Sequence, residues 1–305
     1  MENLRGKTAF ITGGASGIGL GIAKACAAEG MNIVIADMRK AAIDEALEYF
    51  KSSNLPAIGV ELNVTDREAY KSAADSAESA FGKIHVLVNN AGIGCSSGPL
   101  WSVSHKDADV AVAVNLIGVL NGVQEILPRI IAHGEGGHVV ATASKSAIVT
   151  SAGTGLYNIT KSGVVAMMET LATDLQGTPV GASVFAPGGY ITNLGQSSAA
   201  VTAAMTGVAP PAPPPGMAGG IPDSWVGLVR DPLDAGRRVV RGIKRGDLYI
   251  LTHAEFKAGW QSRADAITRA FPDETPNPRY SEVFPFLTGN PIYGKQEQVP
   301  ALPTE

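Results

Sequence analysis

Short apolar runs rich in β-branched residues alternate with segments of helical periodicity along most of the chain. The runs are nearly continuous in apolar residues, which is typical of strands buried on both faces of a parallel sheet. Helical segments between successive strands favour a sheet covered on both sides. The predicted fold class is α/β, a doubly wound parallel sheet in three αβα layers. The strands are expected at 8–13, 32–37, 57–64, 84–92, 138–144, 181–187 and 247–252, with helices stopping near Gly30, Gly82 and Gly177.

The regular alternation breaks after Pro187. The Ala/Ser-rich stretch that follows contains "APPAPPPG" (209–216), which can form neither a regular helix nor a central strand. A connection of this length inside a compact domain is usually a lid or a disordered excursion. We therefore expect one domain over 1–270, a Pro-rich lid at 193–225, and helices at 231–245 and 254–270.

The chain from Phe271 onward carries seven prolines and scattered aromatic residues. Closely spaced prolines interrupt regular secondary structure. We expect 271–305 to be an irregular C-terminal extension that packs against its own subunit or a neighbouring one.

Composition narrows the class of protein. A net charge of −4 over 305 residues argues against a surface that binds nucleic acid. The two cysteines and five histidines show no spacing of a zinc site or a disulfide framework. The first residues, "MENLRGKTAF", lack the features of a secretory signal, and no run approaches the ~18 apolar residues of a membrane span. We expect a soluble cytoplasmic protein with no metal and no membrane contact.

A glycine-rich turn, "TGGASGIG" (12–19), joins the first strand to the first helix. Such a turn lets backbone N–H groups and the positive end of the helix approach a pyrophosphate. Many α/β proteins use a similar turn only to pack strand against helix. Its place directly after the first strand favours the nucleotide-binding interpretation. The residues expected at the phosphates are Gly13, Ser16, Gly17, Ile18 and Gly19.

The second predicted strand ends at Asp37, about 20 residues after the turn, where a carboxylate can hold the adenosine ribose hydroxyls. The same charge would repel a 2′-phosphate, so NAD is favoured over NADP. Arg39 lies close enough in sequence to neutralise a phosphate, which leaves NADP as the alternative.

Tyr157 and Lys161, in "LYNITKSG" (156–163), stand one helical turn apart on the same face. Alone, such a pair is usually an exposed Tyr beside a solvated Lys. Here it follows, in order, "NNAG" (89–92), "VNLIG" (114–118) and Ser144, and precedes "PGGYIT" (187–192). With these motifs the chain resembles the short-chain dehydrogenase/reductase family, closely over 4–192 and loosely over 228–270. The resemblance implies a Rossmann-like fold and an NAD(P)-dependent reaction.

The resemblance implies four catalytic residues: Asn115, Ser144, Tyr157 and Lys161. A free phenol has a pKa near 10, too high for a base at neutral pH. The Lys161 ammonium, together with an oxidised nicotinamide, favours the phenolate, so Tyr157 can take a proton while hydride leaves the alcohol. Ser144 would hold the substrate oxygen, or merely cap a strand end. Asn115 would hold a water that links Lys161 to solvent, or bond only to backbone.

Cofactor contacts follow from the same resemblance. The family usually has Asp, then a small apolar residue, against the adenine, whereas this chain has Asn63 and Val64. The Asn63 amide oxygen can still accept from the adenine amino group. Lys161 and Tyr157 would also face the nicotinamide ribose. The remaining expected contacts are Asn90, Ala91 and Gly92 at the ribose, and Pro187, Gly188 and Thr192 at the nicotinamide.

A substrate pocket is expected beside Ser144 and Tyr157, framed by Cys95, Trp101, Ile148, Thr154 and Tyr190. Cys95 is interpreted as a packing residue, because no motif arranges a His partner for it. Lys145 points either to solvent or to a polar group of the substrate.

An Ala-, Val-, Met- and Pro-rich lid suits an apolar ligand, so we expect a hydrophobic secondary alcohol or its ketone. The segment "NLIGVLNGVQEILPRI" looks like the branch that includes bacterial aryl-alcohol Cα-dehydrogenases. Steroids, terpenoid alcohols and 3-hydroxyacyl compounds stay open.

The family commonly forms homodimers or homotetramers through two long helices, here near 104–132 and 158–176. "VVAMMETLATDL" (164–175) is more apolar than one buried face requires. Two other functions remain as alternatives: an NADPH-dependent ketoreductase, and a non-catalytic nucleotide-binding scaffold on the same fold.

Overall fold

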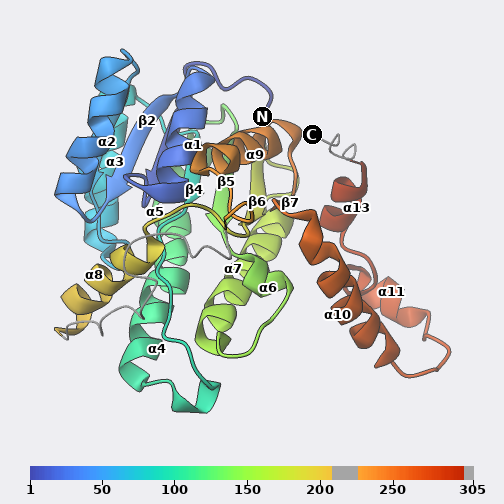
Figure 1. Ribbon diagram of the computed structural model, residues 1–305. Helices are drawn as coiled ribbons and strands as arrows, with labels where there is room; N and C mark the ends of the chain where they lie inside the picture. The colour runs from blue at the N-terminus through green and yellow to red at the C-terminus, as the bar shows by residue number, and fades with distance from the viewer. Residues whose placement is uncertain (208–225, 299–305) are drawn as a thin grey trace.

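The computed structural model describes residues 1–207 and 226–298. Seven parallel strands form one sheet in the order β3-β2-β1-β4-β5-β6-β7 (Figure 1). This confirms the predicted α/β doubly wound class. The strands are β1 Thr8–Thr12, β2 Asn32–Asp37, β3 Ala57–Glu61, β4 Val86–Asn89, β5 Gly137–Thr142, β6 Val180–Ala186 and β7 Tyr249–Leu251.

Two separate hydrophobic clusters show that helices cover both faces of the sheet. Alternate residues of one strand serve different clusters, since side chains in a strand point to opposite faces in turn: Phe10 joins one cluster and Ile11 the other. One face carries α1 (Gly17–Ala28), α2 (Lys40–Ser52) and α9 (Pro232–Arg245). The other carries α3 (Arg67–Phe81), the continuous helix α4–η2–α5 (His105–Val112, Ala113–Ile117, Gly118–Ala132) and α7 (Gly155–Asp174).

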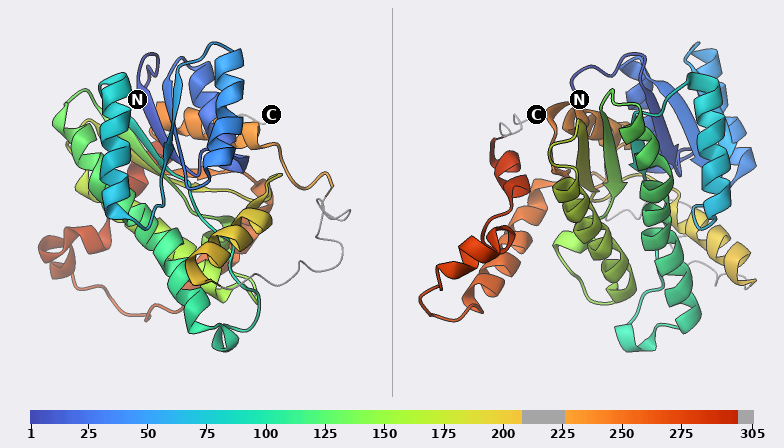
Figure 2. Two further views of the ribbon diagram at one scale, coloured as in Figure 1. Left: turned by 90° about the vertical axis from the view of Figure 1, so that its left-hand side faces the viewer. Right: turned by 180° about the vertical axis from the view of Figure 1, so that it is seen from behind.

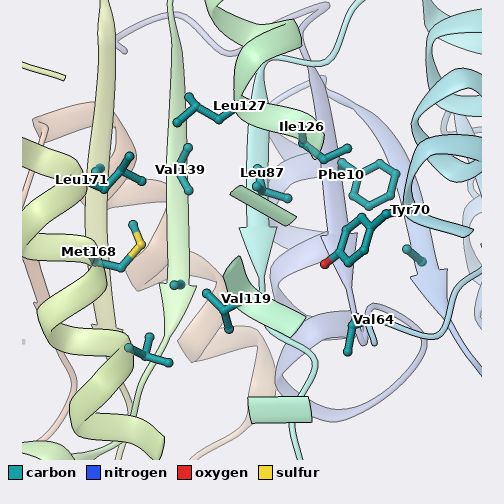
Figure 3. Close-up of a cluster of buried hydrophobic side chains, with 14 of the residues drawn as sticks. Phe10, Val64, Tyr70, Leu87, Val119, Ile126, Leu127, Val139, Met168 and Leu171 are labelled. Carbon is teal, nitrogen blue, oxygen red and sulfur yellow. The ribbon is translucent and has the colours of Figure 1, made fainter. Parts of the chain in front are cut away.

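Figure 3 shows the second of these faces, where the Tyr70 ring of α3 lies beside Phe10 and Ile126. The Tyr70 hydroxyl donates to the carbonyl oxygen of Gly118, 3.2 Å away, so even this buried phenol is hydrogen-bonded. On the opposite face the backbones of α1 and α9 are in contact at Gly21 and Gly236. A β-carbon at either position would collide with the backbone of the other helix.

The helix from His105 to Ala132 is the one helix in the described chain that is long and apolar enough to cross a membrane. From the sequence, no apolar run of this length is expected. Its apolar character has a local cause: 56% of its most apolar window is buried inside the protein.

The segment after Pro187 differs from the expectation of an irregular lid. Residues Leu194–Thr206 form helix α8, which ends at Gly207 in a left-handed conformation with φ of 67°. No proline falls between 194 and 206, and Ala, Ser, Gln and Met tolerate a helix. The Pro-rich motif at 209–216 lies outside the described residues.

The C-terminal extension is helical rather than irregular, which corrects the prediction for 271–305. After η4 (Ala254–Phe256) and α10 (Lys257–Arg269) come α11 (Arg279–Val283), α12 (Pro285–Thr288) and α13 (Pro291–Gln298). Proline is favoured at the first position of a helix, and Pro285 and Pro291 both begin helices. These two prolines, which we interpreted as interruptions, are therefore helix starts. Residues 299–305 lie outside the described part.

The extension returns to the sheet at its end, so that α10–α13 form an arm beside β7 (Figure 2). Gln296 Oε1 accepts hydrogen bonds from the backbone N–H groups of Leu248 (2.7 Å) and Tyr249 (3.1 Å). Ile292 is buried, and Asn290 donates to Thr173 of α7 over 3.0 Å. Helix α13 thereby covers the start of the edge strand β7.

Candidate active site

The glycine turn meets the geometric needs of a pyrophosphate site. Gly13 and Gly17 have φ of 60° and 52°, which side-chain-bearing residues rarely adopt. A β-carbon at Gly19 would collide with the carbonyl oxygen of Gly13. Helix α1 begins at Gly17, and the side chain of its N-cap residue Ser16 makes no hydrogen bond to the first turn. Ser16 therefore leaves the backbone N–H groups of that turn available to an anion.

Asn90 fastens this turn to the neighbouring strands. Its Nδ2 donates to the carbonyl oxygens of Thr12 (3.1 Å) and Gly13 (3.3 Å). Its Oδ1 accepts from the Thr142 hydroxyl over 3.3 Å. The Thr12 hydroxyl in turn accepts from the backbone N–H groups of Asn90 and Ala91, each at 3.0 Å. The ends of β1, β4 and β5 are thus tied together, and Thr12 is a residue that the motifs did not single out.

Asp37 lies at the end of β2 as expected, but its carboxylate is already paired. The Arg39 guanidinium donates to both carboxylate oxygens, each at 3.1 Å, and to the Ser16 hydroxyl at 2.9 Å. Asp37 is buried, whereas the Arg39 side chain is 30% exposed. Asp37, Arg39 and the glycine turn therefore form a single cluster.

The adenine end departs from the expectation for Asn63. Its Oδ1 accepts from the Thr65 backbone N–H (3.1 Å) and the Thr65 hydroxyl (3.0 Å). Both lone pairs are used, so this oxygen is not free to accept from an adenine amino group, which corrects the prediction. Val64 is buried, and its carbonyl oxygen accepts from Asn121 Nδ2 over 2.9 Å.

Tyr157, Lys161 and Ser144 come together at the carboxyl end of β5. Tyr157 and Lys161 lie on the first turns of α7, with Lys161 Nζ 5.8 Å from the centroid of the Tyr157 ring. Lys161 Nζ donates to the carbonyl oxygen of Thr142 over 2.8 Å. Ser144 is the N-cap of the short helix α6 (Lys145–Ile148), and its side chain hydrogen-bonds the phenol.

Burial sets the ionisation of this group. It lowers the pKa of the buried Lys161 ammonium to about 8. Burial also raises the pKa of the Tyr157 phenol, and the hydrogen bond from Ser144 opposes only part of that shift. Lys161 alone therefore does not make the phenol a base, and Tyr157 is a neutral proton donor in the protein by itself.

Asn115 lies in the π-helical turn η2, fully buried. Its Oδ1 accepts from the backbone N–H of Ile93 (2.8 Å), and its Nδ2 donates to the carbonyl oxygen of Ile93 (2.9 Å) and to Thr160 (3.3 Å). This is the backbone-bonded arrangement held open as the alternative to a water-binding side chain. A side chain at position 92 would crowd both catalytic candidates, because a β-carbon there would lie 3.1 Å from Asn115 Oδ1 and 3.3 Å from Lys161 Nζ.

The loop after β6 lies against both the glycine turn and the Ser144 turn. The Pro187 carbonyl oxygen accepts from the Lys145 backbone N–H (2.9 Å), and the Gly188 N–H donates to the Thr252 hydroxyl (2.9 Å). A β-carbon at Gly17 would lie 3.1 Å from Thr192 Cγ2. Thr192 thus lies beside the glycine turn, and its contact with the nicotinamide stays a prediction, whereas Thr252 was not foreseen.

Of the expected substrate residues, Cys95 and Ile148 are half-buried, and Cys95 Sγ lies 4.0 Å from Asn115 Nδ2. Burial raises the pKa of the Cys95 thiol to about 11, which fits a packing role and not a nucleophile. The Thr154 hydroxyl is engaged with the carbonyl oxygen of Ser151 at 2.9 Å and with Asn158 at 3.1 Å. Trp101, on η1 (Leu100–Ser102), is 89% exposed and lies at the outer surface.

Tyr190 is not brought into this group. Its ring is buried in the cluster on the α9 side of the sheet, and its hydroxyl donates to Asp234 over 2.9 Å. This corrects its assignment to the substrate pocket. Lys145 is half-buried, and its Nζ lies 6.0 Å from the centroid of the Phe256 ring.

Helix α8 is latched over the site by Ser198, another residue that the motifs did not indicate. The buried Ser198 hydroxyl accepts from the Gly94 N–H over 2.7 Å, and it donates to the Leu194 carbonyl oxygen in its own helix. At the far end of α8, Lys106 Nζ donates to the Thr206 carbonyl oxygen. Among the residues that the structure describes, no cluster of three metal-ligating side chains is found.

Comparison with known proteins places this site in a family. The model of the short chain dehydrogenase family matches residues 7–202, so the chain belongs to that family. A C alpha-dehydrogenase of Sphingobium sp. (strain SYK-6) is 37% identical over 198 residues, which are 65% of this chain and 65% of that protein.

Two solved structures extend the likeness beyond those residues. A short-chain dehydrogenase from Novosphingobium aromaticivorans shares 30% identity with a TM-score of 0.78, covering 97% of this chain and all of that one. A short chain dehydrogenase/reductase from Burkholderia phymatum, solved in complex with NAD, shares 30% identity with a TM-score of 0.76, covering 91% and 99%. By comparison, the sequence match to the C alpha-dehydrogenase spans just under two thirds of each chain.

Proposed function

We propose that the protein is an NAD-dependent oxidoreductase that interconverts a hydrophobic secondary alcohol and its ketone. The observation that carries the proposal is the grouping of Tyr157, Lys161 and Ser144 at one end of the sheet, beside the glycine turn. A binding scaffold has no need for a buried ammonium one turn from a phenol that is hydrogen-bonded to a serine. A non-catalytic role is therefore disfavoured.

The residues present fit a dinucleotide. The first turn of α1 offers backbone N–H groups at Gly17 without a side-chain cap, and Asp37 stands at the end of the next strand. The turn lies at the carboxyl end of β1, where the sheet order reverses between β1 and β4, which is the usual crevice of such folds, and Asp37 ends the adjacent strand β2. When bound, the oxidised nicotinamide supplies a hydride acceptor and a positive charge.

The chain's own residues then handle the oxygen and the proton. Ser144 would donate a hydrogen bond to the substrate oxygen, and Tyr157 in its phenolate form would accept the hydroxyl proton as the C–H bond gives up hydride to the nicotinamide. In the reverse direction the neutral phenol, favoured by burial, donates that proton to the ketone oxygen. The Lys161 ammonium places a positive charge near the phenol. Together with the positive charge of a bound oxidised nicotinamide, it would favour the phenolate form of Tyr157.

The residues around the catalytic group indicate the substrate class. Cys95 and Ile148 are half-buried beside the catalytic group, and Val201 and Met205 of α8 pack against the same hydrophobic cluster as Ile148. Such walls suit an apolar ligand better than a sugar or a phosphate. The likeness to a C alpha-dehydrogenase supports an aryl-substituted, benzylic alcohol as the first class to test.

Arg39 favours a second candidate, an NADPH-dependent ketoreductase. Its guanidinium lies at the ribose position and would pair with a 2′-phosphate if it left Asp37. NAD remains the proposal because the buried Asp37 carboxylate lies at the end of β2 beside Arg39, where it would repel that phosphate.

The proposal is tested by following the near-ultraviolet absorbance of reduced nicotinamide with a panel of benzylic, alicyclic and steroid secondary alcohols. We expect turnover of at least one benzylic alcohol with NAD, at least tenfold faster in kcat/KM than with NADP. A preference for NADP, or turnover only of polar alcohols, would contradict the cofactor or the substrate class respectively.

Assembly and location stay predictions. Ile131 at the end of α5 and Ile159 on α7 are about half exposed, in keeping with a homodimer or homotetramer formed through these helices. Light scattering coupled to gel filtration measures the mass directly. A monomer at micromolar concentration would contradict this expectation, and fractionation of the native cells tests the cytoplasmic location.

A further inference from the structure

The segment that follows the last strand contacts both loops of the active site. Thr252 and Phe256 lie against the loop at Gly188, while Gly259 and Arg263 lie against helix α6, which begins directly after Ser144. We propose that residues 252–263 form a brace that positions the nicotinamide-end loop and the Ser144 turn. The inference rests on the proposed dinucleotide-dependent function.

The strongest contact is made by Thr252, which is 4% exposed. Its hydroxyl accepts from the Gly188 backbone N–H over 2.9 Å and lies 2.6 Å from His253 Nδ1. Burial lowers the pKa of His253, so the imidazole is neutral near pH 7. The direction of the bond between Thr252 and His253 depends on which ring nitrogen carries the proton, but in either tautomer the Thr252 hydroxyl oxygen keeps a lone pair that accepts from the Gly188 N–H.

Shape reinforces this bond. A β-carbon at Gly188 would collide with the His253 ring and lie 2.8 Å from Phe256 Cε2. The two rings pack face to face at a tilt, with centroids 5.3 Å apart. The backbone of the loop therefore rests directly on a pair of rings, so only a glycine fits and the loop has little room to retreat.

The other end of the brace holds the catalytic serine turn. Arg263 Nη1 donates to the carbonyl oxygens of Ala147 (3.0 Å) and Ile148 (3.3 Å) at the end of α6. A β-carbon at Gly259 would lie 3.0 Å from Val149 Cγ1. Since the Lys145 N–H also bonds to Pro187, the two loops and the brace close into one ring of contacts.

This role was hidden from motif comparison because the family model ends at residue 202. The contacts are made by backbone groups of the family motifs and side chains of the unmatched segment. Thr252 is therefore a positioning residue and not a catalytic one: it acts on the cofactor through Gly188.

The test measures nucleotide affinity in the absence of substrate. Thr252→Val keeps the shape but removes the hydroxyl, Thr252→Ser restores it, and Thr170→Val on the exposed face of α7 is the control. NADH binding, read by fluorescence, should weaken about five- to tenfold in the Val variant and recover in the Ser variant. ADP-ribose, which lacks the nicotinamide, should bind each variant within twofold of the original protein.

Equal NADH affinity in Thr252→Val would overturn the inference, as would an equal loss for ADP-ribose, which would indicate general misfolding. Thr252→Ala provides the same comparison if the Val variant does not fold. Arg263→Met should lower kcat about threefold while NADH affinity stays unchanged, and an unchanged kcat would remove Arg263 from the brace. If the unaltered protein binds neither NADH, NADPH nor ADP-ribose, the proposed function itself fails. That outcome differs from a failure of Thr252 or of Arg263, in which the unaltered protein still binds the nucleotide.

Discussion

Lys161 Nζ lies 2.8 Å from the carbonyl oxygen of Thr142, and this hydrogen bond joins α7 to the end of β5. Ser144 is two residues beyond Thr142, and Tyr157 is one helical turn before Lys161. The bond therefore sets the distance between the serine and the phenol from both sides. It also leaves a buried ammonium with one strong partner, which explains why burial dominates its pKa.

Removing the phenolic oxygen should stop the reaction without disturbing the fold. For Tyr157→Phe we expect kcat to fall by about 10³-fold, since general acid–base groups contribute roughly 10²–10⁴. NADH affinity should stay within a few-fold, as measured by fluorescence titration. Tyr49→Phe, at an exposed ring, is the control with full activity. Near-normal turnover in Tyr157→Phe would refute the assigned role.

Replacing the buried ammonium should raise stability while abolishing activity. The pKa of Lys161 falls from 10.5 to about 8 on folding, so the unfolded chain binds the proton more tightly. Stability is therefore penalised below pH 8 and recovers as the pH rises from 8 to 10.5. Lys161→Met should increase the free energy of unfolding at pH 7 by about 2 kcal/mol, measured by urea denaturation. A large loss of stability would show that the bond to Thr142 outweighs burial.

Acid should destabilise the protein through His138. Burial lowers the pKa of this imidazole from 6.5 to about 3, and its Nε2 pairs with the Ser183 hydroxyl at 2.7 Å. The contribution is present above pH 6.5 and is lost as the pH falls, at about 1.4 kcal/mol per unit. Burial lowers the pKa of His85 as well, which adds to the same trend.

Unfolding free energies measured from pH 7 to pH 4 check this expectation. The free energy of unfolding should depend less steeply on pH in His138→Gln. In the control His105→Gln, at an exposed position, the pH dependence should not change. Parallel curves for His138→Gln and the original protein would contradict it.

The preference for NAD over NADP should change when Arg39 loses its ion pair with Asp37. Asp37→Ala removes the carboxylate that holds the guanidinium, so Arg39 becomes free to pair with a 2′-phosphate. We expect kcat/KM to rise about tenfold with NADP and to fall by a similar factor with NAD. Asp44→Ala, which removes a partner of Lys40 on the exposed face of α2, is the control. An unchanged NADP rate would mean that Arg39 does not reach the phosphate.

The latch between α8 and the β4 loop should affect the substrate more than the cofactor. Ser198→Ala removes the acceptor of the Gly94 N–H, and KM for the alcohol should rise about fivefold while NADH affinity is unchanged. Ser197→Ala is a matched control, because the Ser197 hydroxyl bonds only to carbonyl oxygens at the start of its own helix. Equal effects of the two changes would argue against a latch.

Some expectations failed for reasons that lie in the chain itself. The helices α8 and α11–α13 were missed because composition was averaged over whole segments, although α8 contains no proline and Pro285 and Pro291 stand at helix starts. Asn63 was assigned to adenine by position alone, whereas its neighbour Thr65 takes both lone pairs of the oxygen.

The sequence by itself determined the seven-stranded α/β fold, the glycine turn, and the helical turn that separates Tyr157 from Lys161. These features depend on periodicity, φ restrictions and spacing, which are properties of contiguous residues. Only the tertiary structure decided that Arg39 is committed to Asp37, that Tyr190 turns toward α9, and that Thr252 holds Gly188. Each of these is a contact whose geometry depends on how the chain folds around it. A hydrogen bond is directional over a few tenths of an ångström, so spacing along the chain does not specify it.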